Sequence, residues 1–375
     1  MVNIALIGAT GSIGRQVAEV VSRYPEHFRF SALASSQNGA ELLALANKFR
    51  PAYLALASGE KLALPEGSKQ LFGEEIASGI FEGADIALIA ASGFAGLYYT
   101  LAAIEAGKTV ALANKESLVC GGELVTARAR EKGVTVIPVD SEHSALFQAL
   151  SFRTDTPFAR LILTASGGPF RNLSKEELQF VTAADALKHP TWKMGKKITI
   201  DCATLLNKGY EVIEAHWLYN APYEKIEAVV HPESIIHSIV CFEDGAAIAQ
   251  MGYPDMRLPI QLALTYPKRL PCEKQLDFVS LGSLRFERLQ SEKFPCFELA
   301  LQTGKAGGTL PTALNASAEV AVNAFLQGSI TFPQIAETIE RTLQKTERQE
   351  VRDYETLALC DASARKTAMG IIYGK

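Results

Sequence analysis

The chain has 375 residues, of which 48% are hydrophobic and 21% are charged, a composition that is typical of a folded globular protein and excludes a disordered one. At roughly 150 residues per domain, this length predicts two or three domains. Lysine and arginine number 37 against 41 aspartate and glutamate, so the net charge of -4 leaves no excess of positive charge for a nucleic-acid backbone. We expect no nucleic-acid partner.

Cysteine spacing and the first residues predict a cytoplasmic location. The six cysteines are scattered without C-x-x-C pairs, which indicates a reducing compartment. The chain begins Met-Val-Asn-Ile-Ala-Leu-Ile-Gly, without the basic segment of a signal or transit peptide. Residues 86–104 are uncharged and about as long as a transmembrane helix, but glycines and tyrosines interrupt them. We therefore interpret them as a buried strand, a turn and a helix, and expect no membrane partner.

The first 140 residues alternate short apolar runs with segments of helical periodicity, the pattern of βαβ units. The predicted strands cover residues 2–7, 28–34, 53–56, 86–90, 109–112 and 134–139. The predicted helices cover residues 14–22, 39–49, 96–106 and 121–132. The fold class is therefore α/β, with an N-terminal doubly wound, Rossmann-like parallel sheet over residues 1–140.

After residue 140 the pattern changes to helices and strands that look antiparallel, most clearly residues 234–242 and 246–251 around a Glu243-Asp244-Gly245 turn. We expect a central α+β domain over residues 141–270. Residues 271–295 contain proline and charged pieces without a clear period, which is typical of a linker. Residues 296–375 are rich in Ala, Leu, Glu and Gln at helical spacing and predict a small helical domain.

A glycine-rich turn, Gly8-Ala9-Thr10-Gly11-Ser12-Ile13-Gly14, joins the first predicted strand to the first helix. Such a turn places the diphosphate of a dinucleotide on backbone N–H groups at a helix N-terminus. The spacing is G-x-x-G-x-x-G and differs from the usual G-x-G-x-x-G, so a turn without a ligand remains an alternative. We predict cofactor contacts at Thr10, Gly11, Ser12 and Ile13.

The loop after the second strand reads Ala34-Ser35-Ser36-Gln37-Asn38. NAD-specific sites of this type place a carboxylate there to bind the ribose 2′-hydroxyl. Here no carboxylate repels a 2′-phosphate, and Ser36, Gln37 and Asn38 offer hydrogen-bond donors, although none of them is basic. The sequence favours NADP over NAD, with an ordinary polar loop as the alternative.

Asn114-Lys115-Glu116-Ser117 follows the predicted strand 109–112, at the carboxyl end of the sheet where ligands bind in open α/β folds. Lys115 is a candidate for binding a substrate oxygen, and Asn114 and Glu116 are candidates for the cofactor. The alternative is a solvated helix start.

Two carboxylate groupings predict a metal site. Asp140 and Glu142 follow the strand 134–139, and alternation along a strand would put them on one side. Asn207 and Glu211 are four residues apart, on one face of a helix. Such a set without soft ligands suits Mg²⁺, Mn²⁺ or Co²⁺. Solvated surface carboxylates are the alternative.

Two further segments indicate anion binding and closure. Ser166-Gly167-Gly168-Pro169-Phe170-Arg171 is a glycine-rich loop after the apolar run 161–164, of the kind that presents N–H groups and a hydroxyl to an anion. His189-Pro190-Thr191-Trp192-Lys193-Met194-Gly195 places a tryptophan and a methionine in a polar stretch, which is typical of a lid that excludes water. We predict a lid loop over residues 166–196. A structural loop packed on the core is the alternative.

Taken in order, the segments GATGSIG, ANKES, VDSEHSA, ASGGPFR, HPTWKMGKK, NKGYE, HPESIIHS, GYPDMR and PTALNASAEVAVNAF resemble the 1-deoxy-D-xylulose 5-phosphate reductoisomerases, from residue 8 to about residue 325. The resemblance implies an oxidoreductase and isomerase that converts 1-deoxy-D-xylulose 5-phosphate into 2-C-methyl-D-erythritol 4-phosphate. It implies NADPH and a divalent metal as cofactors and a place in the non-mevalonate route to isoprenoid precursors. It also implies a homodimer and inhibition by fosmidomycin.

The resemblance further implies a role for each matching residue. The metal ligands are Asp140, Glu142 and Glu211. The catalytic residues are Lys115, Glu142, His189 and Glu211. The substrate contacts are Lys115, Ser141, Glu142, Ser166, His189, Trp192, Cys202, Asn207, Lys208 and Glu211. The cofactor contacts beyond the glycine-rich turn and residues 36–38 are Asn114, Glu116, Met194 and Gly195.

This chain departs from the family at two positions. Cys202 stands where the family usually has serine, and a thiol is a poor donor to phosphate. Gln37 stands where many members carry a lysine near the 2′-phosphate. Two other functions remain open from the residues alone: a two-domain NADP-dependent semialdehyde or homoserine dehydrogenase, and a non-catalytic NADP-binding regulator.

Overall fold

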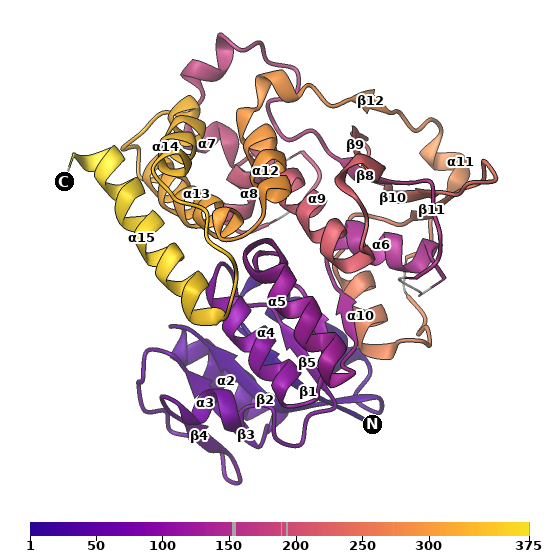
Figure 1. Cartoon of the computed structure of the whole chain (residues 1–375). Coiled ribbons are helices and arrows are strands. Elements are labelled where there is room, and N and C mark those ends of the chain that lie inside the picture. Colours follow the sequence, from indigo (N-terminus) through magenta and orange to yellow (C-terminus); the bar gives the residue numbers. More distant parts are fainter. Residues whose placement is uncertain (152–154, 189, 193, 273, 375) are drawn as a thin grey trace. The chain divides into compact units, whose positions relative to one another are not determined.

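The computed structural model describes residues 1–151, 155–188, 190–192, 194–272 and 274–374 (Figure 1). It divides into two compact units. Unit 1 comprises Met1–Ser117, Val125–Ser144 and Met256–Cys272. Unit 2 comprises Leu118–Leu124, Ala145–Asp255 and Glu273–Lys375.

Unit 1 is built on a parallel sheet with the strand order β4-β3-β2-β1-β5-β6-β7. Its strands are β1 (Val2–Ile7), β2 (Phe28–Ser35), β3 (Tyr53–Leu56), β4 (Lys69–Leu71), β5 (Ile86–Ile89), β6 (Thr109–Leu112) and β7 (Val136–Pro138). Its helices are α1 (Ser12–Arg23), α2 (Gly39–Phe49), α3 (Glu75–Gly79), α4 (Ala95–Glu105) and α10 (Arg257–Thr265), while α5 (Glu116–Lys132) and α6 (Ser141–Ala149) belong in part to each unit.

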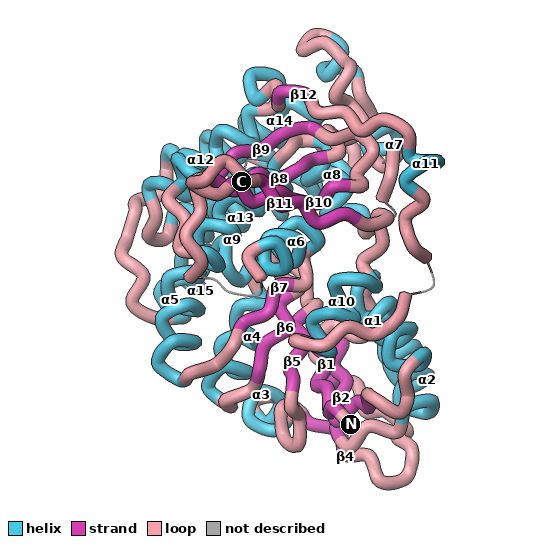
Figure 2. The backbone as a smooth tube through the Cα atoms, turned by 90° about the vertical axis from the view of Figure 1, so that its right-hand side faces the viewer, coloured by secondary structure: helices cyan, strands magenta, loops and turns pink. Residues whose placement is uncertain are grey.

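The sheet of unit 1 has helices on both faces, which confirms the predicted doubly wound fold. In Figure 2, α1, α2 and α10 lie on one side of the strands, and α3 and α4 lie on the other. Because both faces are covered, the central strand β1 is an apolar run that is fully buried from Ile4 to Leu6. Helix α1 covers the sheet with Val17, Ala18 and Val21.

Several boundaries in unit 1 differ from the prediction. Strands β3 and β6 begin and end at the predicted residues. Helix α5 begins at Glu116 and not at Gly121, the predicted start. Gly121 lies inside the helix with a non-helical backbone conformation. Strand β7 is shorter than predicted, and Ser141 already begins α6.

Residues 256–272 pack within unit 1, although residues 256–270 were predicted to lie in the central domain and residues 271 and 272 in the linker. Helix α10 contacts α1, and an ion pair of 3.3 Å joins Arg257 to Glu19. The Tyr24 hydroxyl donates a hydrogen bond to the carbonyl oxygen of Pro271. These contacts hold the segment within unit 1, next to helix α1.

Unit 2 contains a mixed sheet with the strand order β11-β10-β8-β9-β12. Its strands are β8 (Arg160–Ala165), β9 (Ile226–Val230), β10 (Ile236–Cys241), β11 (Ala247–Met251) and β12 (Glu287–Arg288). The predicted hairpin is confirmed, since β10 and β11 are antiparallel with Cys241 opposite Ala247. Strand β8 pairs antiparallel with β10 and parallel with β9. The segment 271–295, expected to be a linker, supplies β12 as a fifth strand beside β9.

The helices of unit 2 are α7 (Ala183–Ala186), α8 (Lys196–Ala203), α9 (Leu206–Tyr219), α11 (Phe278–Leu281), α12 (Pro295–Ala306), α13 (Leu310–Leu326), α14 (Phe332–Gln344) and α15 (Tyr354–Tyr373). The last four form the predicted C-terminal helical part, with α13 packed against α14 and α15. Small residues let these helices approach closely, as at Ala313, Ala316 and Ala364 in the core. Helix α9 packs on α12, and a Cβ on Gly209 would lie 2.4 Å from that of Ala300. Among the helices that the structure describes, none has both the length and the apolar character to span a bilayer.

Candidate active site

The glycine-rich turn between β1 and α1 is held by contacts that exclude larger residues. Gly8 has a φ of +92°, and a Cβ there would lie 2.5 Å from the carbonyl oxygen of Ala90. A Cβ on Gly14 would lie 2.3 Å from the carbonyl oxygen of Gly8. Helix α1 begins at Ser12, and its N-cap Gly11 provides no side-chain cap. The backbone N–H groups of its first turn are therefore left for an anion, as a diphosphate site requires.

The loop that follows β2 lies beside this turn. Both Gly8 and Ala9 donate backbone hydrogen bonds to the carbonyl oxygen of Ala34, at 2.9 and 2.8 Å. The hydroxyls of Thr10 and Ser35 are 2.6 Å apart. The structure thus brings the turn that carries Thr10–Ile13 next to the loop that carries Ser36–Asn38.

Within that loop, Asn38 has a structural role that the sequence did not reveal. Its Oδ1 accepts from the backbone N–H of Glu41 at 3.1 Å and so caps α2. Its Nδ2 donates to a carboxylate oxygen of Glu41 at 2.7 Å. Ser36 and Gln37 are exposed. The sequence analysis also missed Arg15, whose guanidinium binds the same carboxylate at 2.6 and 2.8 Å.

Asn114, Lys115 and Glu116 are buried, so the solvated helix start considered above is wrong. The Asn114 amide donates to the carbonyl oxygen of Gly93 at 3.1 Å and to Glu116 at 2.8 Å. Its Oδ1 accepts from the backbone N–H of Ser117 at 2.9 Å. This network joins the carboxyl ends of β5 and β6, where a doubly wound sheet binds its ligand.

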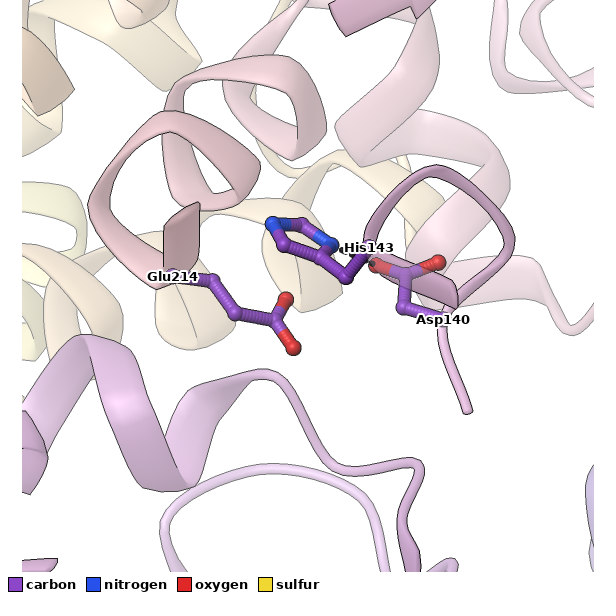
Figure 3. Close-up of side chains that lie close together, drawn as sticks. All are labelled: Asp140, His143 and Glu214. Carbon is purple, nitrogen blue, oxygen red and sulfur yellow. Dashed lines mark ion pairs between the residues drawn. The ribbon is translucent and has the colours of Figure 1, made fainter. Parts of the chain in front are cut away.

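Asp140 is the centre of a buried charged group in unit 1. Its Oδ2 lies 2.7 Å from Nζ of Lys115 and 3.6 Å from Nδ1 of His143. Figure 3 shows the His143 ring turned toward Asp140; Glu214, also drawn, belongs to unit 2. Burial acts to raise the pKa of Asp140, but the positive charge of Lys115 and the neighbouring His143 ring outweigh it and hold the pKa well below its ordinary value. The carboxyl is therefore ionised.

The prediction that strand alternation aligns Asp140 and Glu142 is wrong, because β7 ends at Pro138. Asp140 precedes α6, accepting a backbone hydrogen bond from Ser144 at 2.8 Å, and Glu142 lies in the first helical turn. The Ser141 hydroxyl donates to Glu142. His143, which belongs to a motif noted above but was given no role, is fully buried. Its i, i+3 spacing from Asp140 was the available signal once a helix is assumed.

In unit 2, the start of α9 carries a buried polar group. Leu205, just before the helix, has a φ of +58°. Nδ2 of Asn207 donates to Glu211 at 2.5 Å, which confirms that the two residues share a helical face. Lys208 forms an ion pair with Glu211, and the two side chains are only 4% and 1% exposed. Nζ of Lys208 also donates to the carbonyl oxygen of Thr164 at 2.5 Å.

The glycine-rich loop after β8 lies against the end of α8. Gly167 and Gly168 have positive φ values of +81° and +69°. The backbone N–H of Gly168 donates to the hydroxyl of Ser166 at 3.2 Å, and a Cβ on Gly168 would lie 2.8 Å from the carbonyl oxygen of Cys202. Since Lys208 binds the end of β8, unit 2 gathers Ser166, Cys202 and Lys208 around one strand end. His189 lies outside the described residues.

The predicted lid residues that the structure describes lie beside β10 and the loop before it. The rings of Trp192 and His237 have centroids 6.0 Å apart and are tilted by 54°. The hydroxyls of Thr191 and Ser234 are 3.4 Å apart. Trp192 and Met194 are half-buried, and Gly195 is exposed at the N-cap of α8. The sequence analysis assigned no role to His237, although its motif was noted.

Three sequence models of one family match most of this chain. A model of 1-deoxy-D-xylulose 5-phosphate reductoisomerase matches residues 4–122, a model of its C-terminal domain matches residues 136–219, and a DXP reductoisomerase C-terminal domain model matches residues 251–367. A 1-deoxy-D-xylulose 5-phosphate reductoisomerase of Geobacillus sp. (strain WCH70) is 48% identical, covering 98% of this chain and 99% of that protein. That of Pelotomaculum thermopropionicum is 47% identical, covering 99% of each.

Solved structures agree in fold. The reductoisomerase from Zymomonas mobilis in complex with NADPH superposes with a TM-score of 0.91 at 38% identity, covering all of both chains. A DOX-P reductoisomerase in complex with NADPH, fosmidomycin and magnesium gives a TM-score of 0.91 at 37% identity, covering 99% of this chain and 98% of that one. This chain therefore belongs to the 1-deoxy-D-xylulose 5-phosphate reductoisomerase family.

Proposed function

We propose that this protein converts 1-deoxy-D-xylulose 5-phosphate into 2-C-methyl-D-erythritol 4-phosphate, with NADPH and a divalent cation, in the non-mevalonate route to isoprenoid precursors. The observation that carries the proposal is the 48% identity over 98% of the chain to a protein of that name. The two rival functions would explain the parallel sheet of unit 1. They do not explain why the sequence of unit 2 also matches the reductoisomerase family.

We propose that Asp140, Glu142 and Glu211 bind the cation. The donor set fits a hard divalent ion, because it consists of carboxylate oxygens, and Asp140 is ionised. A related DOX-P reductoisomerase was solved in complex with magnesium. When bound, such an ion supplies a Lewis acid that polarises a substrate carbonyl. Without the ion, Lys115 balances the negative charge of Asp140, and Lys208 balances that of Glu211.

The chain's own residues position the substrate. We assign its phosphate to Ser166, Cys202, Asn207 and Lys208, together with His189. The support is that Ser166, Cys202 and Lys208 surround the end of β8 and that Lys208 is a buried cation. Binding the phosphate, which is remote from the reacting carbons, orients the rest of the molecule. Lys115 and Ser141 contact the carbon backbone, and Trp192 is the lid residue that excludes water over it.

The cofactor is assigned to unit 1. The N–H groups of Ser12 and Ile13 and the hydroxyl of Thr10 bind the diphosphate of NADPH. Gly11 lets the diphosphate approach the turn closely, while its own N–H donates to the carbonyl oxygen of Gly8. Ser36, Gln37 and Asn38 face its 2′-phosphate. We assign Asn114 and Glu116, at the carboxyl ends of the strands, to the same cofactor. The family resemblance also assigns Met194 and Gly195, which belong to unit 2, to cofactor binding.

We propose that residues 1–140 mainly bind NADPH and that residues 141–255 mainly bind the metal and the substrate, since residues 256–272 pack within unit 1. We also propose that the protein is a homodimer and works in the cytoplasm. The proposal of a cytoplasmic location rests on the spacing of the six cysteines, which are scattered along the sequence without C-x-x-C pairs. Gel filtration with light scattering measures the oligomeric state, and a monomeric mass would contradict the dimer.

The test of the function is the loss of NADPH absorbance when 1-deoxy-D-xylulose 5-phosphate and Mg²⁺ are added to the protein. We expect turnover that stops on adding EDTA and returns on adding excess Mg²⁺. Turnover that EDTA leaves unchanged would support a metal-independent dehydrogenase. NADPH binding without any turnover would support a non-catalytic regulator.

A further inference from the structure

Arg15 is a basic residue next to the predicted 2′-phosphate loop, at a position to which no role has been assigned above. Its backbone N–H donates to the carbonyl oxygen of Gly11 at 3.0 Å, so Arg15 lies one helical turn beyond a residue of the diphosphate site. Its side chain is 58% exposed, compared with 26% for its partner Glu41. The guanidinium is therefore accessible to a ligand.

Glu41 fixes the direction in which this guanidinium points. The Arg15–Glu41 contact is bidentate, with Nε and one Nη atom bound to the two carboxylate oxygens at 2.6 and 2.8 Å. The same carboxylate accepts from Nδ2 of Asn38 at 2.7 Å. Arg15 and Asn38 thus donate to the same carboxylate. This shared contact holds the positive charge of Arg15 beside the loop of residues 36–38.

Arg15 has capacity for a second anion. A guanidinium carries five N–H donors, and the Glu41 contact uses two of them. Planar guanidinium groups bind phosphate with paired hydrogen bonds. Glu41 would repel a 2′-phosphate at this loop if its charge were not compensated, so Arg15 would both remove that repulsion and supply donors.

We propose that Arg15 is the residue that makes this enzyme prefer NADPH, by binding the 2′-phosphate in the place of the lysine that many family members carry where this chain has Gln37. The proposal rests on the proposed function, since it concerns the cofactor of that reaction. Asn38 and Glu41 act as positioning residues for the guanidinium.

The test is the binding of two fragments, 2′,5′-ADP and 5′-AMP, by isothermal titration calorimetry. They differ in the 2′-phosphate and require no catalysis. We expect Arg15→Gln to weaken the binding of 2′,5′-ADP by about 10-fold or more and to leave the affinity for 5′-AMP unchanged. The matched control is Lys48→Gln, which removes a positive charge from the far end of the same helix pair, where Lys48 donates to Ser22 at 2.9 Å. Lys48→Gln should change neither affinity.

A rescue experiment distinguishes charge from structure. Adding Gln37→Lys to Arg15→Gln returns a cation to the loop and should restore most of the lost affinity for 2′,5′-ADP. In steady state, the ratio of kcat/KM for NADPH to that for NADH should fall in Arg15→Gln and recover in the double variant.

The outcomes separate the two proposals. A wild-type protein that binds 2′,5′-ADP no more tightly than 5′-AMP would contradict the NADPH preference within the proposed function. Wild-type discrimination that persists in Arg15→Gln would overturn the role of Arg15 alone. Equal weakening of both fragments, without rescue by Gln37→Lys, would also overturn it, because the residue would then only support the turn.

Discussion

Nζ of Lys115 lies 2.7 Å from Oδ2 of Asp140, and the two side chains are only 8% and 13% exposed. Lys115 therefore holds the Asp140 carboxylate in place and keeps it ionised. We assign this carboxylate as a ligand of the divalent cation. A buried ion pair of this kind is costly to break from one side, because the remaining charge loses its partner. Stability and metal binding can thus be separated by substitution.

Asp140→Asn should lower the free energy of unfolding by about 3 kcal/mol, because Lys115 is left as a buried charge without its ion pair. It should also reduce turnover at least 100-fold. The double variant Asp140→Asn/Lys115→Met should regain most of the stability but no activity. Urea unfolding followed by circular dichroism, together with steady-state assays, measures both; a double variant as unstable as the single one would contradict the ion-pair account.

Glu211→Gln should retain the fold and NADPH binding but lose most activity, with the apparent Kd for Mg²⁺ raised. It should also lower the free energy of unfolding, because the buried Lys208 loses its ion pair. Glutamine has nearly the shape of glutamate, and Lys208 keeps its bond to the carbonyl oxygen of Thr164. The matched control is Glu224→Gln, an exposed carboxylate of the same unit that should have no effect. Near-normal turnover of Glu211→Gln at saturating Mg²⁺ would show that Glu211 is not a ligand.

Gly168→Ala should raise the KM for the phosphosugar, because the new Cβ would lie 2.8 Å from the carbonyl oxygen of Cys202 and displace the loop of Ser166. Gly245→Ala is the control for backbone strain alone. Gly245 also has a positive φ, +87°, but nothing lies within 4 Å of the added Cβ. If both variants raised KM equally, the steric contact at Gly168 would not matter for substrate binding.

Cys202→Ser should lower the KM for the phosphosugar. A hydrogen bond to a charged group is worth about 1.5 to 3 kcal/mol, so the gain is at most roughly 100-fold. It should appear in KM with little change in kcat, because the phosphate is remote from the reacting carbons. The affinity for fosmidomycin, an anionic inhibitor expected in the same pocket, should rise in parallel. Weaker binding of both ligands would mean that the thiol serves packing.

Trp192 should report lid closure by its fluorescence. The chain has two tryptophans, and Trp217→Phe removes the second signal. The indole ring of Trp192 lies beside the ring of His237, and closure of the lid would change the environment of the indole. We expect the emission of Trp192 to shift when fosmidomycin and Mg²⁺ are added together. An unchanged spectrum at saturating ligand would contradict a lid role.

Apolar periodicity was sufficient to predict six of the seven strands that the structure describes in the sheet of unit 1, because strands such as β3 and β6 are largely buried apolar runs between turn residues. Strands β4 and β12 were missed, since three and two residues are too few to show alternation. The helical spacing of Asn207 and Glu211 was enough to predict their contact. The bond between Arg15 and Glu41 was not predictable, because it joins two helices that only the tertiary fold places together.

The proposed reaction first rearranges the carbon skeleton of the substrate and then reduces the product of that rearrangement. The most direct measurement is ¹³C NMR of labelled 1-deoxy-D-xylulose 5-phosphate incubated with the protein, NADPH and Mg²⁺. We predict the branched 2-C-methyl-D-erythritol 4-phosphate, formed in equal amount to the NADPH consumed. An unbranched reduced sugar phosphate formed with the same NADPH consumption would contradict the account, because it would show hydride transfer without rearrangement.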